Sequence, residues 1–207
     1  MKVGLVRGHL VVRSKAHGAD QSLPFQYNPE TVRRQLAPQQ TGGGAGDQSD
    51  ASYLMGPPTE TISLEIELDS TDTPSANPNL VKANGVLPYL NLLETLLYPD
   101  SDAVKRNRKK LSQGVLELIP YPAPFVRLVL GSRSMPVRLE SCSITEQIFD
   151  PMLNPIRAQV ELQFKVVNYA QVTPGNLDFD RFLSYQEAKE RRAKQAATQK
   201  PPRGRGH

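Results

Sequence analysis

Catalytic and metal sites in proteins are built mainly from histidine, cysteine, serine and carboxylate side chains, and this chain holds few of them in useful patterns. Its three histidines, His9, His17 and His207, form neither a His-x-x-x-His motif nor a pair with the single cysteine, Cys142. A histidine or cysteine metal site would need such an arrangement. We therefore expect no metal and no cofactor, surface or strand positions for the histidines, and a buried strand position for Cys142.

Three short motifs have residue types that can carry chemistry, but each lacks a necessary neighbour. The glycine run Gly42–Gly46 is not followed by the Gly-Lys-Ser/Thr of a phosphate-binding loop, so we interpret it as a flexible loop. Ser132 and Ser134 lie in a predicted hairpin turn without the Gly-x-Ser-x-Gly context of a nucleophilic serine. Asp100 and Asp102 follow a predicted helix stop, where carboxylates are usually solvated. The sequence therefore predicts no enzyme and no small-molecule substrate.

Basic side chains are densest in one short run. Within residues 105–110, five positions are positive: Lys105, Arg106, Arg108, Lys109 and Lys110. Such a run binds phosphates in a salt-dependent way, yet no aromatic residue is interleaved with it to stack on bases. We expect a solvated loop or a contact with an acidic protein surface, and we keep a monomeric nucleic-acid-binding module as the alternative function. Arg191 and Arg192 are further basic contact candidates.

The chain length fits one domain and a tail. The 207 residues are expected to form a domain at 1–172, followed by a C-terminal helix and a basic disordered tail at 173–207. Within the domain, residues 35–58 and 101–111 are predicted to be mobile loops. No apolar run reaches the roughly 20 residues that span a bilayer, and no signal-peptide pattern follows Met1. We expect the protein to be cytoplasmic on synthesis.

A period of two marks the clearest predicted strands. Between Ile156 and Val166 every second residue is apolar, and the segment Thr59–Asp69 alternates in the same way from Ile62 onward. Each segment is therefore predicted to be a half-buried antiparallel strand. The polar faces of these two strands include Glu65, Glu67, Arg157, Gln159, Glu161 and Gln163.

Weaker patterns predict the remaining elements. In one further strand Val137 and Leu139 share one parity, and Cys142 and Ile144 share the other. All four point inward only if a bulge lies near Ser141. Apolar residues repeat at intervals of three and four in two other segments, which predicts amphipathic helices. The other strands are predicted at 2–14, 23–28 and 125–130, and the helices at 86–97 and 176–198.

Four blocks along the chain, in one order, resemble the tube-domain proteins of contractile injection systems and contractile phage tails. The first is Phe25–Thr31, which has a Phe-x-Tyr-Asn-Pro pattern and precedes a glycine-rich loop. The second is the alternating strand Ile62–Thr71, and the third is the proline, strand and glycine block Pro122–Gly131. The fourth is the hairpin in which Phe149-Asp150 is followed by Asn154-Pro155-Ile156-Arg157-Ala158.

The resemblance implies a mainly β (α+β) fold, an antiparallel β-sandwich or barrel of the tail-tube type with one flanking helix and a C-terminal helix. Proteins of this family form sixfold rings that stack into an inner tube, so the polar strand faces would line the lumen or the seam between subunits. The chain departs from the family at Leu153, where the hairpin commonly has glycine. The ring or partner interface candidates are Phe25, Tyr27, Asn28, Pro29, Glu65, Glu67, Asn154, Pro155, Arg157, Gln159, Glu161 and Gln163.

Within the family, the expanded loops resemble the adaptor that joins the spike to the first tube ring more than the repeating tube subunit. Such adaptors often carry a C-terminal LysM domain, for which the residues after 172 leave no room. The resemblance therefore predicts a structural component of an injection particle or phage-like tail, as tube initiator or spike adaptor, with the main inner-tube subunit as the alternative. The implied partners are further copies in a hexameric ring, the inner tube protein, a VgrG-like spike protein and baseplate wedge proteins.

Overall fold

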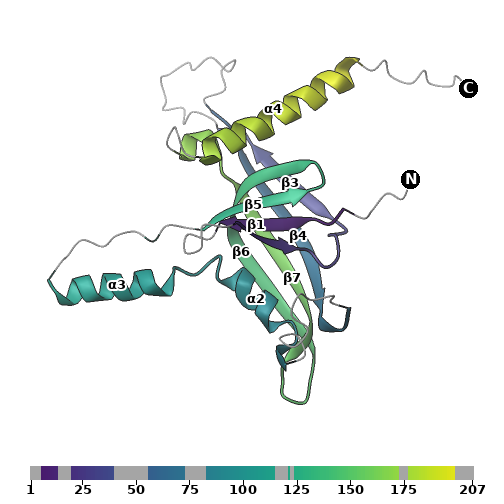
Figure 1. Cartoon of the computed structure of the whole chain (residues 1–207). Helices are drawn as coiled ribbons and strands as arrows, with labels where there is room; N and C mark the ends of the chain where they lie inside the picture. The colour runs from purple at the N-terminus through teal and green to yellow at the C-terminus, as the bar shows by residue number, and fades with distance from the viewer. Residues whose placement is uncertain are drawn as a thin grey trace, which may run out of the picture.

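Seven strands form one antiparallel sheet, and helices cover or flank it (Figure 1). The computed structural model describes residues 6–13, 20–39, 56–72, 83–114, 121, 124–172 and 177–198. The strands are β1 (His9–Arg13), β2 (Asp20–Pro24), β3 (Val32–Ala37), β4 (Thr59–Asp69), β5 (Phe125–Leu130), β6 (Arg133–Phe149) and β7 (Pro155–Val166). Their order across the sheet is β2-β1-β5-β6-β7-β4-β3, and all neighbours are antiparallel.

The helices occupy different ends of this sheet. In the described part of the chain they are α2 (Leu87–Glu94), α3 (Ser101–Ser112) and α4 (Leu177–Thr198), with 3-10 turns η1 (Ser70–Asp72) and η2 (Tyr169–Gln171). Figure 1 shows α4 lying across one end of the sheet, the β6–β7 turn at the opposite end, and α3 extending sideways from the body. The predicted mainly β fold with flanking helices is confirmed. None of the described helices is long and apolar enough to cross a bilayer.

The alternation of β4 and β7 builds the centre of the core. In the register of this pair, Leu64 lies opposite Leu162 and Ile66 lies opposite Val160, and all four side chains are buried. Such cross-strand apolar pairs are the main source of sheet stability. The intervening residues of both strands face away from this core, as the period of two requires.

Helices close the core on two sides. Leu90 and Leu93 of α2 and Phe182 and Tyr185 of α4 belong to the same buried apolar cluster as the sheet. The ring of Tyr169 in η2 meets that of Phe182 edge to face, with the ring centroids 5.7 Å apart. Such an aromatic pair adds about 1 kcal/mol beyond the area that it buries. The first half of α4 is therefore held by packing against the sheet.

The predicted bulge in β6 is confirmed. Leu139 pairs with Phe164 and Cys142 with Leu162, and the register shifts between Leu139 and Ser141. The shift lets Leu139 lie buried while Cys142 packs partly buried against the same core. An extra residue at this point thus lets residues of odd and even number point to the same inward face of the strand.

The predicted mobile loop at 101–111 is wrong, because these residues form α3. The Asp100 carboxylate accepts a hydrogen bond from the backbone N–H of Ala103 at 2.9 Å, so it acts as the N-cap and is not merely solvated. Lys109 and Lys110 lie in the last turn, where positive charge favours the helix dipole. Long basic residues are good helix formers, but they give no apolar periodicity to detect.

The predicted loop at 35–58 begins too early. β3 continues to Ala37, which pairs with Thr59 of β4. Residues 40–55, with the glycine run Gly42–Gly46, lie outside the described residues, as do the basic tail at 199–207 and residues 2–5 and 14 of the first predicted strand.

The second predicted strand is displaced towards the N-terminus. β2 spans Asp20–Pro24, not 23–28, because Phe25 leaves the ladder and donates its backbone N–H to the Gly8 carbonyl at 2.8 Å. A Cβ on Gly8 would lie 2.8 Å from the Phe25 ring, so the close approach depends on glycine. Phe25, the large apolar residue that suggested a longer strand, is instead buried just beyond the end of β2.

Candidate functional site

The residues that could carry chemistry serve structural roles in this fold. Asp100 caps α3, and Ser132 is tied to α4. Cys142 is half buried, and burial raises the pKa of its thiol, which favours the protonated form. Among the described residues, no group of three or more histidine, cysteine or carboxylate side chains is placed to hold a metal ion.

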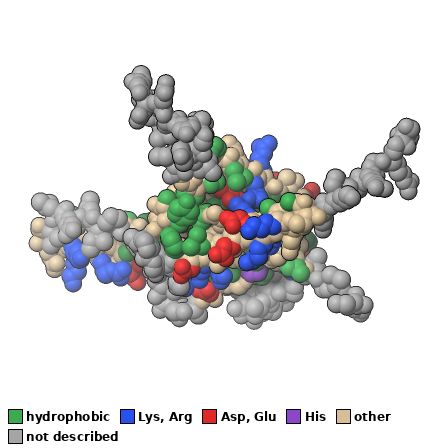
Figure 2. All heavy atoms as spheres, turned by 90° about the horizontal axis from the view of Figure 1, so that it is seen from above, with side chains coloured by type: hydrophobic (Ala, Val, Ile, Leu, Met, Phe, Trp, Pro, Cys, Tyr) green, Lys and Arg blue, Asp and Glu red, His purple; other side chains and the backbone are tan. Residues whose placement is uncertain are grey.

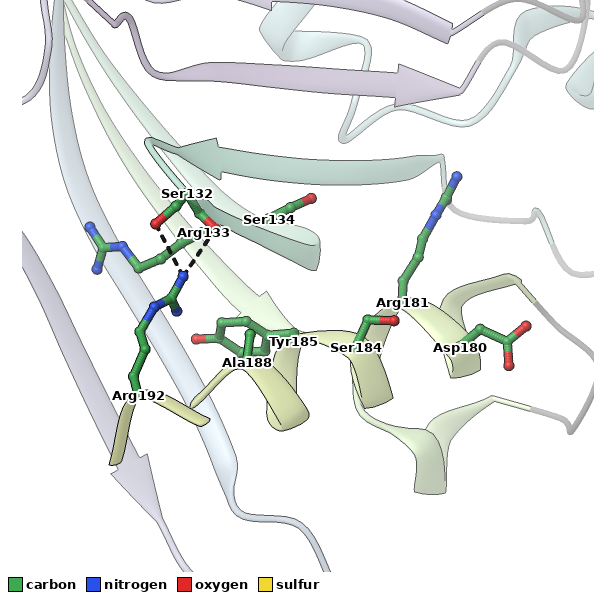
Figure 3. Close-up of a pocket in the computed structure, with 9 residues that line it drawn as sticks. All are labelled: Ser132, Arg133, Ser134, Asp180, Arg181, Ser184, Tyr185, Ala188 and Arg192. Atoms are coloured by element: carbon green, nitrogen blue, oxygen red, sulfur yellow. Dashed lines mark hydrogen bonds between the residues drawn. The ribbon is translucent and has the colours of Figure 1, made fainter. Parts of the chain in front are cut away.

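An open groove lies between α4 and the β5–β6 turn (Figure 3). Arg192 donates to the backbone carbonyl of Ser132 at 3.3 Å and to its hydroxyl oxygen at 3.1 Å. Figure 3 shows that Arg133, Arg181 and Asp180 point in different directions and do not converge on one point of the groove. The hydrogen bonds in the groove therefore hold α4 against the β5–β6 turn, and the side chains drawn there do not place a nucleophile beside a base.

A buried carboxylate holds α4 on the sheet, and we call this group the Glu60 latch: Glu60, Arg34, Tyr185 and Lys189. Glu60 is 3% exposed. Its Oε1 accepts from Nε of Arg34 at 2.9 Å and from the Tyr185 hydroxyl at 3.0 Å, and its Oε2 accepts from Nζ of Lys189 at 2.7 Å. The Lys189 ammonium also lies 4.1 Å from the centre of the Tyr185 ring. Two strands and α4 thus meet at one carboxylate.

The electrostatics of the latch follow from these contacts. Burial alone would raise the pKa of Glu60, but the hydrogen bonds from Lys189 and Arg34 outweigh it and hold that pKa below its usual value. Burial is the main reason why the pKa of Tyr185 is strongly raised, so the phenol stays a hydrogen-bond donor. No sequence pattern reveals this group, because its members come from β3, β4 and α4.

The motif Phe25–Pro29 closes the end of the sheet near η1. Asn28 accepts a hydrogen bond from the backbone N–H of Gly8 at 2.8 Å and donates to the Val6 carbonyl at 3.0 Å. The Tyr27 hydroxyl donates to the Asp72 carboxylate at 2.5 Å, and Phe25 is fully buried. Pro29 is half buried. Phe25 and Asn28 therefore have local structural roles, whereas the partly exposed Tyr27 ring lies at the surface.

A second buried carboxylate, Asp69, joins this motif to β7. Its Oδ2 accepts from Nε and Nη2 of Arg157 at 3.0 and 2.7 Å, and its Oδ1 accepts from the Thr71 hydroxyl at 2.6 Å. The Gln26 side chain bonds both backbone groups of Asp69. The Thr71 hydrogen bond is the main cause of the lowered pKa of Asp69. Glu67 lies 3.3 Å from Arg157, so the structure brings these two predicted residues together.

The other predicted polar residues share one exposed face of the sheet. Gln159 donates to Glu65 across β7 and β4, and Ser141 donates to Gln163 at 3.3 Å. Glu65, Ser141, Glu161 and Gln163 border a shallow groove that crosses β3, β4, β6 and β7, and Gln159 lies outside its lining. The described sheet ends at β2 and β3, whose outer edges have no strand beside them there. Such a surface is suited to contacts with another protein chain.

The β6–β7 turn is a fixed structure with an apolar tip. Asp150 accepts hydrogen bonds from the backbone N–H groups of Met152 and Asn154 and from the Asn154 side chain, each at 2.8 Å. Ile148 and Leu153 have φ values of 53° and 64° in the left-handed region, which costs energy for a β-branched residue in particular. Glycine would adopt the left-handed conformation of Leu153 at less cost, because it has no Cβ. The exposed apolar side chains of the tip are Ile148, Phe149, Met152 and Leu153.

Replacing Asp150 with alanine should loosen this turn. The change removes the acceptor for three N–H groups, so we expect roughly tenfold faster amide hydrogen exchange at Met152 and Asn154. Exchange in β4 should stay unchanged. A Glu146→Ala variant, altered at an exposed site of the same hairpin, is the matched control. Equal exchange in both variants would show that the carboxylate does not hold the turn.

Stability should fall in mild acid. In the folded protein Glu60, Asp69 and Asp150 all have lowered pKa values, so each favours folding above its unfolded pKa of about 4. That contribution is lost as the pH falls through the folded pKa. We expect a melting temperature that is flat between pH 7 and 5 and falls below about pH 4. A melting temperature that is unchanged at pH 3 would contradict this assignment.

The predicted basic residues lie on two separate helices. Lys105, Arg106, Arg108, Lys109 and Lys110 are exposed on α3, whereas Arg191 and Arg192 are on the second half of α4. Figure 2 shows basic side chains along the arm that α3 forms, apart from those over α4. In the described chain they do not form one continuous track, which a nucleic-acid backbone would need.

Comparison with known families agrees with the fold and with the block order. The model of the contractile injection system tube protein family matches residues 10–174. This range includes all seven strands of the described sheet, apart from His9, the first residue of β1. A search of the curated proteins gave no significant match to this chain. The family is one of structural proteins that assemble with other tube components, and it favours a structural over a catalytic role. The chain belongs to the contractile injection system tube protein family and is a tube-type structural protein of such a particle.

Proposed function

We propose that this protein forms the ring that joins the spike and baseplate hub to the inner tube, and that it initiates assembly of the tube. The observation that carries the proposal is α4, which begins after the family match ends at residue 174. The Glu60 latch and the Arg192–Ser132 hydrogen bonds fasten this helix over one end of the sheet. The β6–β7 turn lies at the other end (Figure 1).

The position of α4 suits a ring with different neighbours on its two sides. A subunit that repeats along a tube presents one end to the ring above and the other end to the ring below. In this chain, an added helix covers one of those ends and changes its shape and charge. Such a ring is suited to meet the tube at one end and the spike, with baseplate wedge proteins around it, at the other.

The exposed sheet edges and the polar face support the proposal that the protein forms a ring. A head-to-tail interface generates a closed ring when its rotation closes, and we propose six copies. Pairing between the outer edges of β2 and β3 of neighbours would remove exposed edges. Glu65, Glu161 and Gln163 would then line the lumen or the seam between subunits.

A nucleation assay tests the initiator role. The purified chain is added at a small fraction of the concentration of its particle's inner tube protein, and tube growth is followed by light scattering. We expect a shorter lag and a constant amount of this chain for each tube, whatever the tube length. Incorporation in proportion to its share of the mixture would instead identify a main tube subunit.

Matched variants of α4 make the assay specific. Lys189→Ala with Arg192→Ala removes contacts that hold the helix to the sheet. Arg191→Ala with Lys194→Ala removes the same charge from exposed positions of the same helix. We expect only the first pair to slow nucleation. The same loss in both would mean that charge, and not the placement of α4, is what matters.

A further inference from the structure

The tip of the β6–β7 hairpin combines apolar surface with negative charge. Met152 and Leu153 are 82% and 78% exposed, and Ile148 and Phe149 are exposed beside them. Residues 145–156 contain two carboxylates, Glu146 and Asp150, and no lysine or arginine. The Asp150 hydrogen bonds hold the tip in one shape, so little conformational entropy remains to be lost on binding.

Residues 97–112, which follow α2 and include all of α3, have the complementary composition. We call this segment the α2–α3 arm. Its exposed apolar side chains are Leu97, Tyr98, Val104 and Leu111. Within α3, Val104, Arg108 and Leu111 are spaced so that they share one face, because residues four and seven apart lie above one another on a helix. No side chain of α3 is buried in this chain, and Figure 1 shows the helix standing away from the sheet.

We propose that the hairpin tip of one copy docks on the α2–α3 arm of a neighbouring copy. The two surfaces are complementary, because an apolar, acidic tip meets an apolar, basic face of another copy of the same polypeptide. Because the two surfaces differ, the contact can repeat head to tail from one copy to the next, as a ring requires. The tip apolar residues insert beside Val104 and Leu111, and Glu146 meets Arg108. This inference rests on the proposed self-assembly and adds a second contact between neighbouring copies to the pairing of sheet edges.

Site-specific cross-linking tests the contact in the full-length chain. In a Cys142→Ser background, a Met152→Cys chain and a Val104→Cys chain carry different affinity tags and are mixed and oxidised under conditions in which the unmodified chain assembles. We expect a disulfide-linked product that contains both tags. A Gln195→Cys chain, exposed on α4, replaces the Val104→Cys chain in the control and should give little product. Equal product in the control, or none in the test, overturns the contact.

A charge exchange gives a second readout. Arg108→Glu changes the face that holds Val104, whereas Arg106→Glu makes the same change on the opposite face. We expect Arg108→Glu to weaken self-association at least roughly fivefold and Arg106→Glu to change it little. Mixing the Arg108→Glu chain with a Glu146→Lys chain should restore association. Equal effects of the two arginine variants, or no restoration, would overturn the contact.

These results separate this contact from the proposed function. If the unmodified chain assembles but neither cross-linking nor charge exchange behaves as expected, this contact is wrong and ring formation stands. If the unmodified chain stays a monomer even with the inner tube protein, both are wrong. Capture of a different particle protein by the Met152→Cys chain, without capture of a second copy, also overturns it.

Discussion

Replacing Glu60 with alanine is expected to destabilise the protein by about 3 kcal/mol and to release α4 from the sheet. The change leaves Arg34, Lys189 and the Tyr185 hydroxyl around an empty site, with no carboxylate to accept their hydrogen bonds. Removing one member of a buried charged group is strongly destabilising, because the remaining groups keep their desolvation penalty. We take a value at the low end of the known range, since Arg34 and Lys189 are partly exposed.

Two measurements check this effect. Urea unfolding gives the loss of stability, and hydrogen exchange mass spectrometry shows whether α4 loses protection before the sheet does. Glu190→Ala, at an exposed position one residue beyond Lys189, is the control and should change stability by less than about 0.5 kcal/mol. A Glu60→Ala protein that keeps the protection of α4 would show that apolar packing alone holds the helix.

Replacing Gly85 with alanine is expected to cost about 3 kcal/mol of stability. Gly85 has a φ of +58°, and a Cβ there would lie 2.1 Å from the Pro155 carbonyl oxygen. That carbonyl also accepts the backbone N–H of Val86 at 2.9 Å, so the start of α2 and the start of β7 are joined at this point. The added methyl group must push two backbone segments apart.

Gly131 provides a matched control for the backbone conformation. Its φ is +59°, but nothing lies within 4 Å of the position that a Cβ would take, so Gly131→Ala measures the conformational cost alone. We expect about 1 kcal/mol for Gly131→Ala by chemical denaturation, and the excess in Gly85→Ala reports the clash. Equal losses at the two positions would show that α2 moves freely relative to β7.

The elements that sequence predicted well are those in which one local period decides the structure. β4 and β5 have the predicted bounds, and the bulge in β6 lies where the parity of Leu139 and Cys142 changes. A period of two is visible within a few residues, so it needs no knowledge of distant partners. A single buried residue such as Phe25 leads to a wrong strand boundary, because an apolar residue just beyond the end of a strand cannot be told from part of the strand.

The surfaces were only partly predictable. The polar face of Glu65, Gln159 and Glu161 follows from alternation alone, and the structure places these residues together. The Glu60 latch does not follow, because Lys189 lies 129 positions from Glu60 in sequence. An acidic residue at an outward or inward strand position looks the same until its partners are known. Asp150 belongs to a motif that is visible in the sequence, but only the hydrogen bonds show that it shapes the tip.

Electron microscopy of intact particles, isolated through an affinity tag on this chain, tests the central claim most directly. We predict one ring of density with sixfold symmetry at the junction of spike and tube, fitted by the seven-stranded sheet with α4 over one end. Density of this chain along the whole tube would contradict the initiator role, and recovery of the chain alone would contradict ring assembly.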